Sequence, residues 1–167
     1  MNGAIKHPLR HTQYSVHPPT QFICTHLDQL LPEWSCAARS VLIVLQPCDS
    51  DLFARSRTVE DQKQRLRRQF LRFGYRVATQ IAHLGEATAI FDPRTGWPLL
   101  SRPGQLRLDD VAVIRACLGY QTVDSHGCLI IFHPQWQSAV YPSTLITSAA
   151  PATVKQLVGT MTGIMAS

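Results

Sequence analysis

The sequence lacks any apolar run that approaches the roughly 20 residues needed to span a bilayer. Residues 1–20 contain neither the apolar segment nor the cleavage signal of a secretory leader. The five cysteines include no Cys-x-x-Cys pair, which argues against a zinc ribbon, and their odd number argues against a disulfide framework. We therefore expect a cytoplasmic protein with reduced thiols.

Signature motifs of several enzyme classes are also missing. The chain has no Gly-x-Gly-x-x-Gly, no P-loop, no Gly-x-Ser-x-Gly and no His-Glu-x-x-His. Adjacent carboxylates occur at Asp109-Asp110, where they predict a helix cap rather than an acid–base pair. These absences argue against the enzyme classes that the motifs define.

Charge is scarce at one end of the chain and concentrated elsewhere. The formal net charge is +5, yet Lys155 is the only charged residue after Asp124. Arginines crowd residues 55–76, on what we expect to be the exposed face of a helix. Such a face is usually solvated, and the alternative is that it binds an anionic partner. We do not expect nucleic acid to be that partner.

The length of 167 residues suits one domain with a substantial core. Residues 1–19 have little periodicity and predict a flexible arm, followed by a single domain at residues 20–167. We expect a short strand at residues 21–25 and a helical turn at residues 26–31.

Two segments carry strong periodic signals. The apolar, β-branched run at residues 40–46 predicts a central strand that is covered on both faces. Apolar residues spaced by three and four predict a long helix that starts at Thr58 and stops at Gly85. Gly74, inside this helix, marks either a close contact or a break.

The second half of the chain mixes strands with short helices. A turn at Asp92–Gly96 predicts a hairpin between residues 86–91 and 97–100. A short helix follows Asp109-Asp110, and Pro151 starts the last helix. We expect residues 129–133 to pair with the strand at residues 138–147. The fold class is therefore α+β, with a mainly antiparallel sheet, a long helix and a C-terminal helix.

A candidate reactive thiol opens the apolar run at residues 128–132. Strand alternation would place Asp124, His126 and Cys128 on one side. Gly127 would allow close backbone approach, and His126 could accept the thiol proton or stabilise the thiolate when protonated. The alternative is a buried, inert cysteine that packs as a small apolar residue. Among the five cysteines, Cys128 is the best candidate for reactivity.

The same residues allow two further interpretations. A hydrolase triad of Cys128, His126 and Asp124 is disfavoured, because the members of such triads usually come from distant segments. A zinc site of His126, Cys128 and His133 lacks a visible fourth ligand, and alternation separates His133 from Cys128.

Several motifs taken in order resemble those of the CblD family (methylmalonic aciduria and homocystinuria type D protein), over residues 20–160. The motifs are Phe91-Asp92-Pro93-Arg94-Thr95-Gly96, Leu118-Gly119-Tyr120, Val123-Asp124-Ser125-His126-Gly127-Cys128, Trp136 and Thr147-Ser148-Ala149-Ala150-Pro151. The resemblance implies a fold similar to the flavin nitroreductase scaffold, without use of flavin. It also implies a role in intracellular vitamin B12 processing.

The resemblance implies a partner and a cobalt ligand. In the family the protein docks on CblC, which removes the upper ligand of cobalamin, and the cysteine of the Gly-Cys step is proposed to ligate cobalt. That cysteine corresponds to Cys128, whereas Leu129 stands where the animal member has a second cysteine. Gly127 and, by our hypothesis, His126 and Asp124 are its neighbours, the latter two tuning the thiol. We expect a non-enzymatic adaptor that meets cobalamin only through this partner.

Two alternative functions remain open. One is a flavin- or cobalamin-dependent reductase on the same scaffold, although the sequence shows no clear flavin phosphate site. The other is nucleic-acid binding through the arginine-rich helix face. Downstream cobalamin enzymes are candidate further partners of the adaptor.

Overall fold

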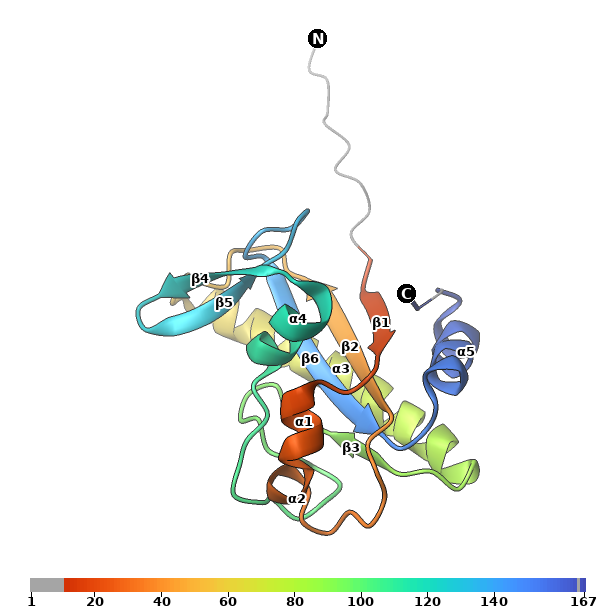
Figure 1. Cartoon of the computed structure of the whole chain (residues 1–167). Helices are drawn as coiled ribbons and strands as arrows, with labels where there is room; N and C mark the ends of the chain where they lie inside the picture. The colour runs from red at the N-terminus through yellow and green to blue at the C-terminus, as the bar shows by residue number, and fades with distance from the viewer. Residues whose placement is uncertain (1–10, 165) are drawn as a thin grey trace.

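The chain folds into layers around a four-stranded antiparallel sheet (Figure 1). The computed structural model describes residues 11–164 and 166–167. The strand order is β1-β2-β6-β3, and these strands are Gln13–His17, Ser40–Pro47, Val140–Thr147 and Thr88–Ile90. A separate hairpin consists of β4 and β5, which are Gln121–Ser125 and Cys128–Phe132.

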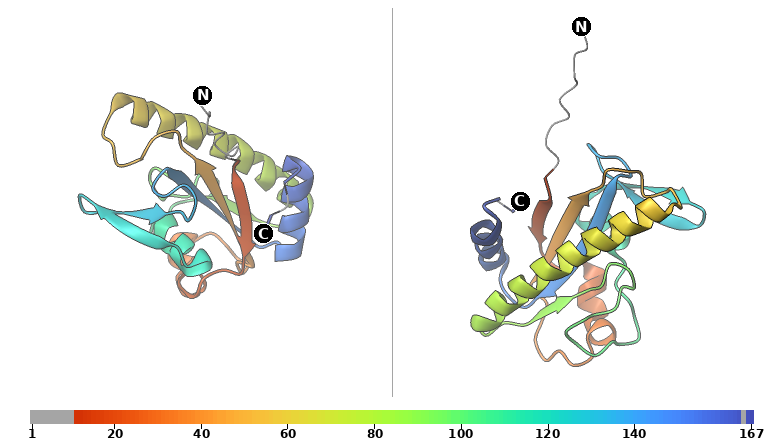
Figure 2. Two further views of the ribbon diagram at one scale, coloured as in Figure 1. Left: turned by 90° about the horizontal axis from the view of Figure 1, so that it is seen from above. Right: turned by 180° about the vertical axis from the view of Figure 1, so that it is seen from behind.

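Helices cover both faces of the sheet, as the view from above in Figure 2 shows. One face is covered by α3 (Arg57–His83) and α5 (Pro151–Thr162). The opposite face is covered by the hairpin and by three shorter helices, α1 (Gln21–Thr25), α2 (Leu27–Leu30) and α4 (Asp110–Leu118). Within the described residues, no helix combines the length and apolarity needed to cross a membrane. The predicted α+β class is confirmed, while the likeness to the nitroreductase scaffold stays a prediction.

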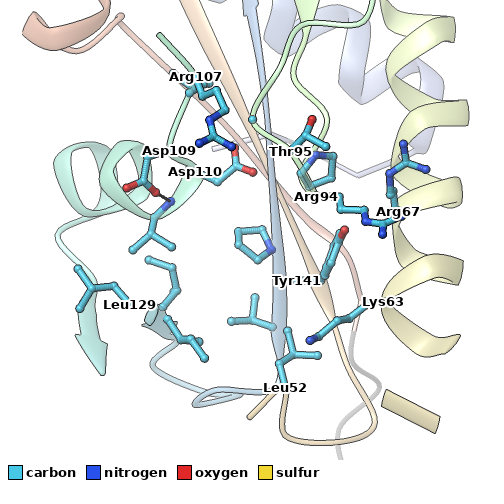
Figure 3. Close-up of a pocket in the computed structure, with 18 of the residues that line it drawn as sticks. Leu52, Lys63, Arg67, Arg94, Thr95, Arg107, Asp109, Asp110, Leu129 and Tyr141 are labelled. Carbon is cyan, nitrogen blue, oxygen red and sulfur yellow. Dashed lines mark hydrogen bonds between the residues drawn. The ribbon is translucent and has the colours of Figure 1, made fainter. Parts of the chain in front are cut away.

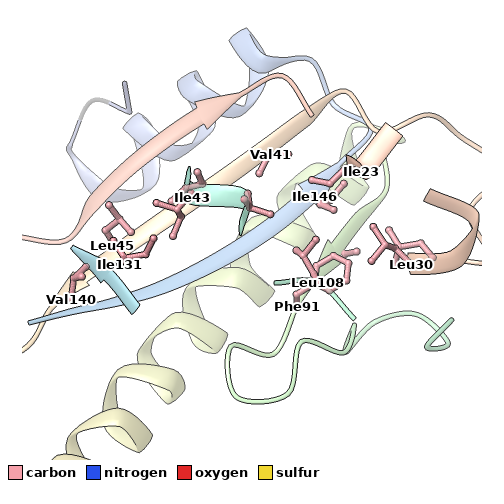
Figure 4. Packing of buried hydrophobic residues seen from close by; sticks show 14 of the residues in the cluster. Ile23, Leu30, Val41, Ile43, Leu45, Phe91, Leu108, Ile131, Val140 and Ile146 are labelled. Atoms are coloured by element: carbon pink, nitrogen blue, oxygen red, sulfur yellow. The ribbon is translucent and has the colours of Figure 1, made fainter. Parts of the chain in front are cut away.

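Strand β2 is buried at every position from Ser40 to Gln46. Successive side chains point to opposite faces, so Leu42 and Val44 pack toward α3 and α5. The alternate residues, Val41, Ile43 and Leu45, join the cluster under α4 and the hairpin (Figure 4). The predicted central strand, covered on both faces, is confirmed.

Helix α3 runs where the apolar periodicity predicts it, but the predicted first residue is wrong. Ser56, not Thr58, is the N-cap, and its side chain accepts a hydrogen bond from the Val59 N–H. Both hydroxyl residues suit this position, and the local pattern does not choose between them. A Cβ at Gly74 would lie 3.3 Å from Ile90 of β3, so this glycine marks a close contact and not a break.

The predicted flexible arm at residues 1–19 is wrong for Gln13–His17, which forms β1. This strand pairs antiparallel with β2, and Val16 is buried. The backbone of Ser167 covers the outer side of β1, because it exchanges hydrogen bonds with Val16 and Tyr14. The rest of the predicted arm falls partly on residues 1–10, which lie outside the described residues.

Residues 21–25 form α1 and not the predicted strand. Thr20 caps this helix by accepting a hydrogen bond from the Ile23 N–H, a local alternative to strand pairing. The predicted hairpin after β3 is also reduced, because only one bridge joins Phe91 and Pro98. Proline lacks the N–H that a continued ladder needs.

The predicted pairing of β5 with β6 is wrong. Strand β5 pairs with β4, while β6 lies between β2 and β3. The predicted helices at the ends of this region are confirmed. Helix α4 starts at the Asp109 cap and stops at Gly119, which has a φ of 67°, and α5 begins at Pro151.

Candidate functional site: an exposed thiol beside a charged cavity

The candidate thiol lies at the end of the β4–β5 hairpin. His126 and Gly127 form the two-residue turn, with φ values of 53° and 83°, and positive φ at both positions defines a type I′ turn. The Asp124 carboxylate accepts a hydrogen bond of 3.0 Å from the Gly127 N–H. Asp124 therefore holds the turn that presents Cys128.

This turn overturns the predicted alternation of Asp124, His126 and Cys128. Cys128 pairs across the hairpin with Ser125, and His126 lies in the turn beyond both strands. The His126 ring nitrogen lies 3.3 Å from the Ser125 hydroxyl. Among the described residues, no hydrogen bond joins His126 to Cys128 or to Asp124. The hydrolase triad is not assembled.

Cys128 is exposed, so the alternative of a buried cysteine is wrong, while the reactivity of the thiol stays a prediction. Its side chain lines a cleft of about 500 Å³ between the hairpin tip and the start of α3. Positively charged or ionisable groups predominate among the polar side chains there, including Arg55, Arg57, Lys63 and His126, with Glu60 as their acidic neighbour. Lys63 pairs with Glu60 at 2.9 Å.

His133 does not take part in a metal site. It is buried, and its Nε2 lies 3.0 Å from the side-chain oxygen of Gln13. Its Nδ1 accepts hydrogen bonds from the N–H groups of Gln135 and Trp136, and its ring stacks on Trp136. Burial lowers the pKa of His133. The predicted alternative of a zinc site is not supported, since the described residues contain no group of three or more candidate metal ligands.

A second cavity, of about 600 Å³, adjoins the thiol cleft. Figure 3 shows it between α4 and β5 on one side and α3 on the other. Strand β3 pairs only with residues 145–147 of β6, so the earlier part of β6 borders this space at Val140–Pro142. The cavity and the cleft share the side chains of Leu52, Glu60, Lys63 and Ile130.

An ion pair fixes one wall of this cavity. The Arg67 guanidinium donates two hydrogen bonds to Asp92, of 2.8 and 2.6 Å. The bond from Arg67 is the main reason why the pKa of Asp92 lies below its usual value. Asp92 also accepts a hydrogen bond from the Arg94 N–H at 3.0 Å. The pair ties the turn at Asp92–Gly96 to the middle of α3.

Asp110 is the unexpected titratable group in this cavity. Burial, assisted by the charges of Asp109 and Asp92, raises its pKa to about 7, and the nearby Thr144 hydroxyl opposes this rise. The buried Asp110 Oδ1 and Thr144 Oγ1 both lack a partner in proper hydrogen-bond geometry among the described residues. Figure 3 shows the Asp110 carboxyl pointing into the cavity.

The sequence contains a signal for Asp110 that the capping prediction misses. The Asp109-Asp110 pair is predicted to cap α4, but Asp109 alone accepts the hydrogen bonds from the Val111 and Ala112 N–H groups. Asp110 lies three and four residues before the buried Val113 and Ile114. Residues at these spacings share one face of a helix, so the second acid faces inward.

The sequence model of one family matches the chain. Its description is methylmalonic aciduria and homocystinuria type D protein, and the match covers residues 11–158. No curated protein is significantly similar to the chain. The matched range contains the hairpin, both cavities and also β1, which falls within the predicted arm.

Proposed function

The chain belongs to the CblD family, the methylmalonic aciduria and homocystinuria type D protein family, which has a role in cobalamin metabolism. On this premise we propose that the chain is a cobalamin-handling adaptor. The adaptor docks on a CblC-like partner that carries cobalamin, in the cytoplasm, and offers the Cys128 thiolate to cobalt. It does not itself catalyse a reaction, and it meets cobalamin only within the complex.

The observation that carries this proposal is the position of Cys128. The thiol is exposed at the end of a hairpin that projects from the body of the protein (Figure 1). A thiol that would bind the cobalt of a cobalamin carried by another protein has to be exposed in this way, because both proteins would hold the same metal. Leu129 offers no sulfur at the next position.

The chemistry of the site suits a thiolate–cobalt bond. A thiolate is a soft donor for a late transition metal, and coordination requires loss of the thiol proton. Cys128 would supply the sulfur lone pair to cobalt, and its proton would pass to solvent. Arg55, Arg57 and Lys63 line the cleft beside the sulfur, where their positive charge offsets the charge that the thiolate acquires.

Apolar side chains on the hairpin support docking. Val123, Leu129 and Phe132 are 39%, 50% and 37% exposed. The pairing register places Val123 and Phe132 on the same face of the hairpin as Cys128. Exposed apolar groups that lie together are typical of interaction surfaces. A partner that covers this face would bring its corrin to the sulfur.

The test combines the protein, a CblC-like partner and cobalamin, and records the corrin absorption spectrum and the complex on gel filtration. Wild-type protein is expected to form the complex and to change the spectrum. Cys128→Ser is expected to form the complex and leave the spectrum unchanged. Cys24→Ser and Cys36→Ser are matched controls, because these cysteines are also exposed, and they should behave as wild type.

Each part of the proposal has its own contradicting result. A spectral change that survives Cys128→Ser excludes the thiolate ligand. Failure to form a complex excludes docking. A purified protein that retains flavin after gel filtration favours the reductase alternative instead.

A further inference from the structure

The cavity of about 600 Å³ beside α4 has no role in the proposed adaptor function. Its volume falls in the range that small-molecule sites occupy, roughly 300–1,000 Å³. Its polar groups are distributed unevenly. Figure 3 shows Asp109 and Asp110 on the side of α4, together with Arg107, and the basic side chains of Lys63, Arg67 and Arg94 on the side of α3 and of the turn at Asp92–Gly96.

The acidic end centres on Asp110. Its Oδ1 is buried and makes no hydrogen bond of full geometry among the described residues, although the neighbouring hydroxyl of Thr144 on β6 still favours its ionised form. Buried polar atoms normally have partners, because an unmade hydrogen bond costs the full desolvation of the group. The charge of Asp109 adds negative potential at this end. A cationic hydrogen-bond donor would satisfy Asp110 and this potential together.

The basic end centres on Arg94. Its backbone is anchored by the hydrogen bond to Asp92, and its side chain is exposed toward the cavity without an ion pair in the described part of the chain. Arg67 already forms an ion pair with Asp92. Lys63 lies on the same side and pairs only with the exposed Glu60. A carboxylate is the group that this end would bind, because guanidinium matches it with two parallel hydrogen bonds.

Apolar side chains lie between the two ends. They include Leu52, Leu108, Val111, Ile131, Val140 and Pro142. We propose that the cavity binds a small zwitterion of dipeptide size, with its amine against Asp110, its apolar body on these side chains and its carboxylate against Arg94 and Lys63. This site is distinct from the Cys128 sulfur and does not depend on cobalamin.

Three probes that differ only at their ends provide the test. Leucyl-leucine carries both charges, N-acetyl-leucyl-leucine lacks the amine charge, and leucyl-leucinamide lacks the carboxylate. Isothermal titration and amide chemical shifts measured on the full chain are expected to show that leucyl-leucine binds at least about tenfold more tightly than either blocked probe. Equal affinity for the three probes, or no binding of any, would overturn the proposal.

Variants assign each end of the probe to a residue. Asp110→Asn should remove the preference for a free amine, while Arg94→Gln should remove the preference for a free carboxylate. Arg68→Gln is the matched control, because Arg68 is exposed on α3 and does not line the cavity. If leucyl-leucine is still preferred over the blocked probes in both variants, the assignment of its two ends to Asp110 and Arg94 is wrong, even if the probe binds. The wild-type comparison stands without the variants if one of them fails to fold.

Proton release and the Cys128→Ser variant distinguish binding in this cavity from binding in the thiol cleft. The charged and polar groups around Asp110 are Asp109 and Arg107 just before its own helix, Asp92 in the turn with its partner Arg67 on α3, and Tyr141 and Thr144 on β6. The amine must stay protonated while the carboxylate is ionised, so binding of leucyl-leucine should strengthen and release protons as pH rises from about 5 to 7, and weaken above about pH 8, where the free amine loses its own proton. Cys128→Ser should leave this binding unchanged. Loss of binding in Cys128→Ser would place the probe in the thiol cleft and refute the proposed site.

Discussion

The central sheet and the β4–β5 hairpin distribute their apolar side chains in opposite ways. Along β2, every residue from Ser40 to Gln46 is buried. Along the hairpin, Val123, Leu129 and Phe132 are all more than one-third exposed. A two-stranded hairpin is marginally stable on its own, and this one rests on the body mainly through Ile131. The sheet is therefore the well-packed support of the fold, and the proposed docking surface lies on the element that packs least.

The largest expected effect is a cavity in the sheet. Ile43→Ala should reduce the free energy of unfolding by about 2–5 kcal/mol, because Ile43 is fully buried and its neighbours cannot collapse completely. Urea denaturation measures the change. Leu129→Ala, on the half-exposed hairpin position, is the control and should cost less than about 1 kcal/mol. Equal losses from the two variants would remove the distinction between the regions.

The next effect concerns the ion pair that ties the cavity wall to α3. Arg67→Ala leaves the Asp92 carboxylate buried without its partner. We expect a loss of about 3 kcal/mol in the free energy of unfolding, since breaking a buried pair strands a charge. Arg65→Ala, whose pair with Asp49 is exposed, is the control and should change stability by about 0.5 kcal/mol or less. A small effect of Arg67→Ala would show that water reaches Asp92 freely.

The stability of the protein should depend on pH through Asp110. Its pKa in the folded chain is about 7, above the ordinary value of 3.8, so the folded chain holds a proton that the unfolded chain has released. The contribution of Asp110 to the free energy of unfolding therefore falls as pH rises from about 4, and it levels off above about pH 7. Asp110→Asn should be more stable than wild type at pH 8, by a difference of order 2 kcal/mol, but not at pH 4.

Wild type has to be compared with Asp110→Asn because other groups change their protonation in the same pH range. Burial lowers the pKa values of His133 and His17, so their contributions rise with pH and oppose that of Asp110. Urea denaturation of both proteins from about pH 4 to 8 isolates the Asp110 contribution. A difference that stays constant across this range would contradict a buried, titrating carboxyl.

A smaller effect is expected at the hairpin turn. Gly127→Ala introduces a Cβ at a φ of 83°, although nothing lies within 4 Å of that position. The cost is therefore conformational, about 1 kcal/mol, and it should appear as faster amide exchange in β4 and β5 but not in β2. Gly85→Ala, at a φ of 77° and also in open space, is the control and should leave exchange in the hairpin unchanged.

The smallest effect on stability is expected for Phe132→Ser, which should nevertheless weaken binding to the CblC-like partner. Phe132→Ser alters an exposed side chain on the Cys128 face, so unfolding should change by about 0.5 kcal/mol or less. Gel filtration with the CblC-like partner should show weaker association. Phe22→Ser is the control, because Phe22 is exposed on α1, away from the hairpin. Unchanged association of Phe132→Ser would exclude this face as the docking surface.

The elements that can be predicted from sequence are those with strong internal periodicity. β2, α3, α4 and α5 follow from apolar spacing and caps, and these signals are local. The pairing of strands is a non-local choice, so the sequence pattern favours β6 as the neighbour of β5 although β4 is its partner. β1 escapes prediction because its alternation is weak, and its burial depends on contact with β2.

The sequence predicts a candidate residue for the site, Cys128, but not the geometry around it. Cys128 follows from the ordered family motifs, whereas the pattern of alternating residues fails because His126 and Gly127 turn the chain. The turn signal is present, since Gly accepts positive φ, but His rarely does. Asp110 cannot be placed in a cavity from sequence, because its neighbours Thr144 and Asp92 come from distant segments of the chain.

The incomplete pairing of β6 has a consequence for aggregation. The Thr144 carbonyl accepts a hydrogen bond from Phe91 on the side away from β2, and Pro142, two residues earlier, has its backbone on the same side. Proline offers no N–H there, so another chain cannot extend the sheet along this edge with a full ladder. At the opposite edge, the Ser167 backbone occupies β1. Strand addition at β1 and along the part of β6 that β3 leaves unpaired is therefore limited by the backbone, in a chain that has few charges after Asp124 to provide electrostatic repulsion.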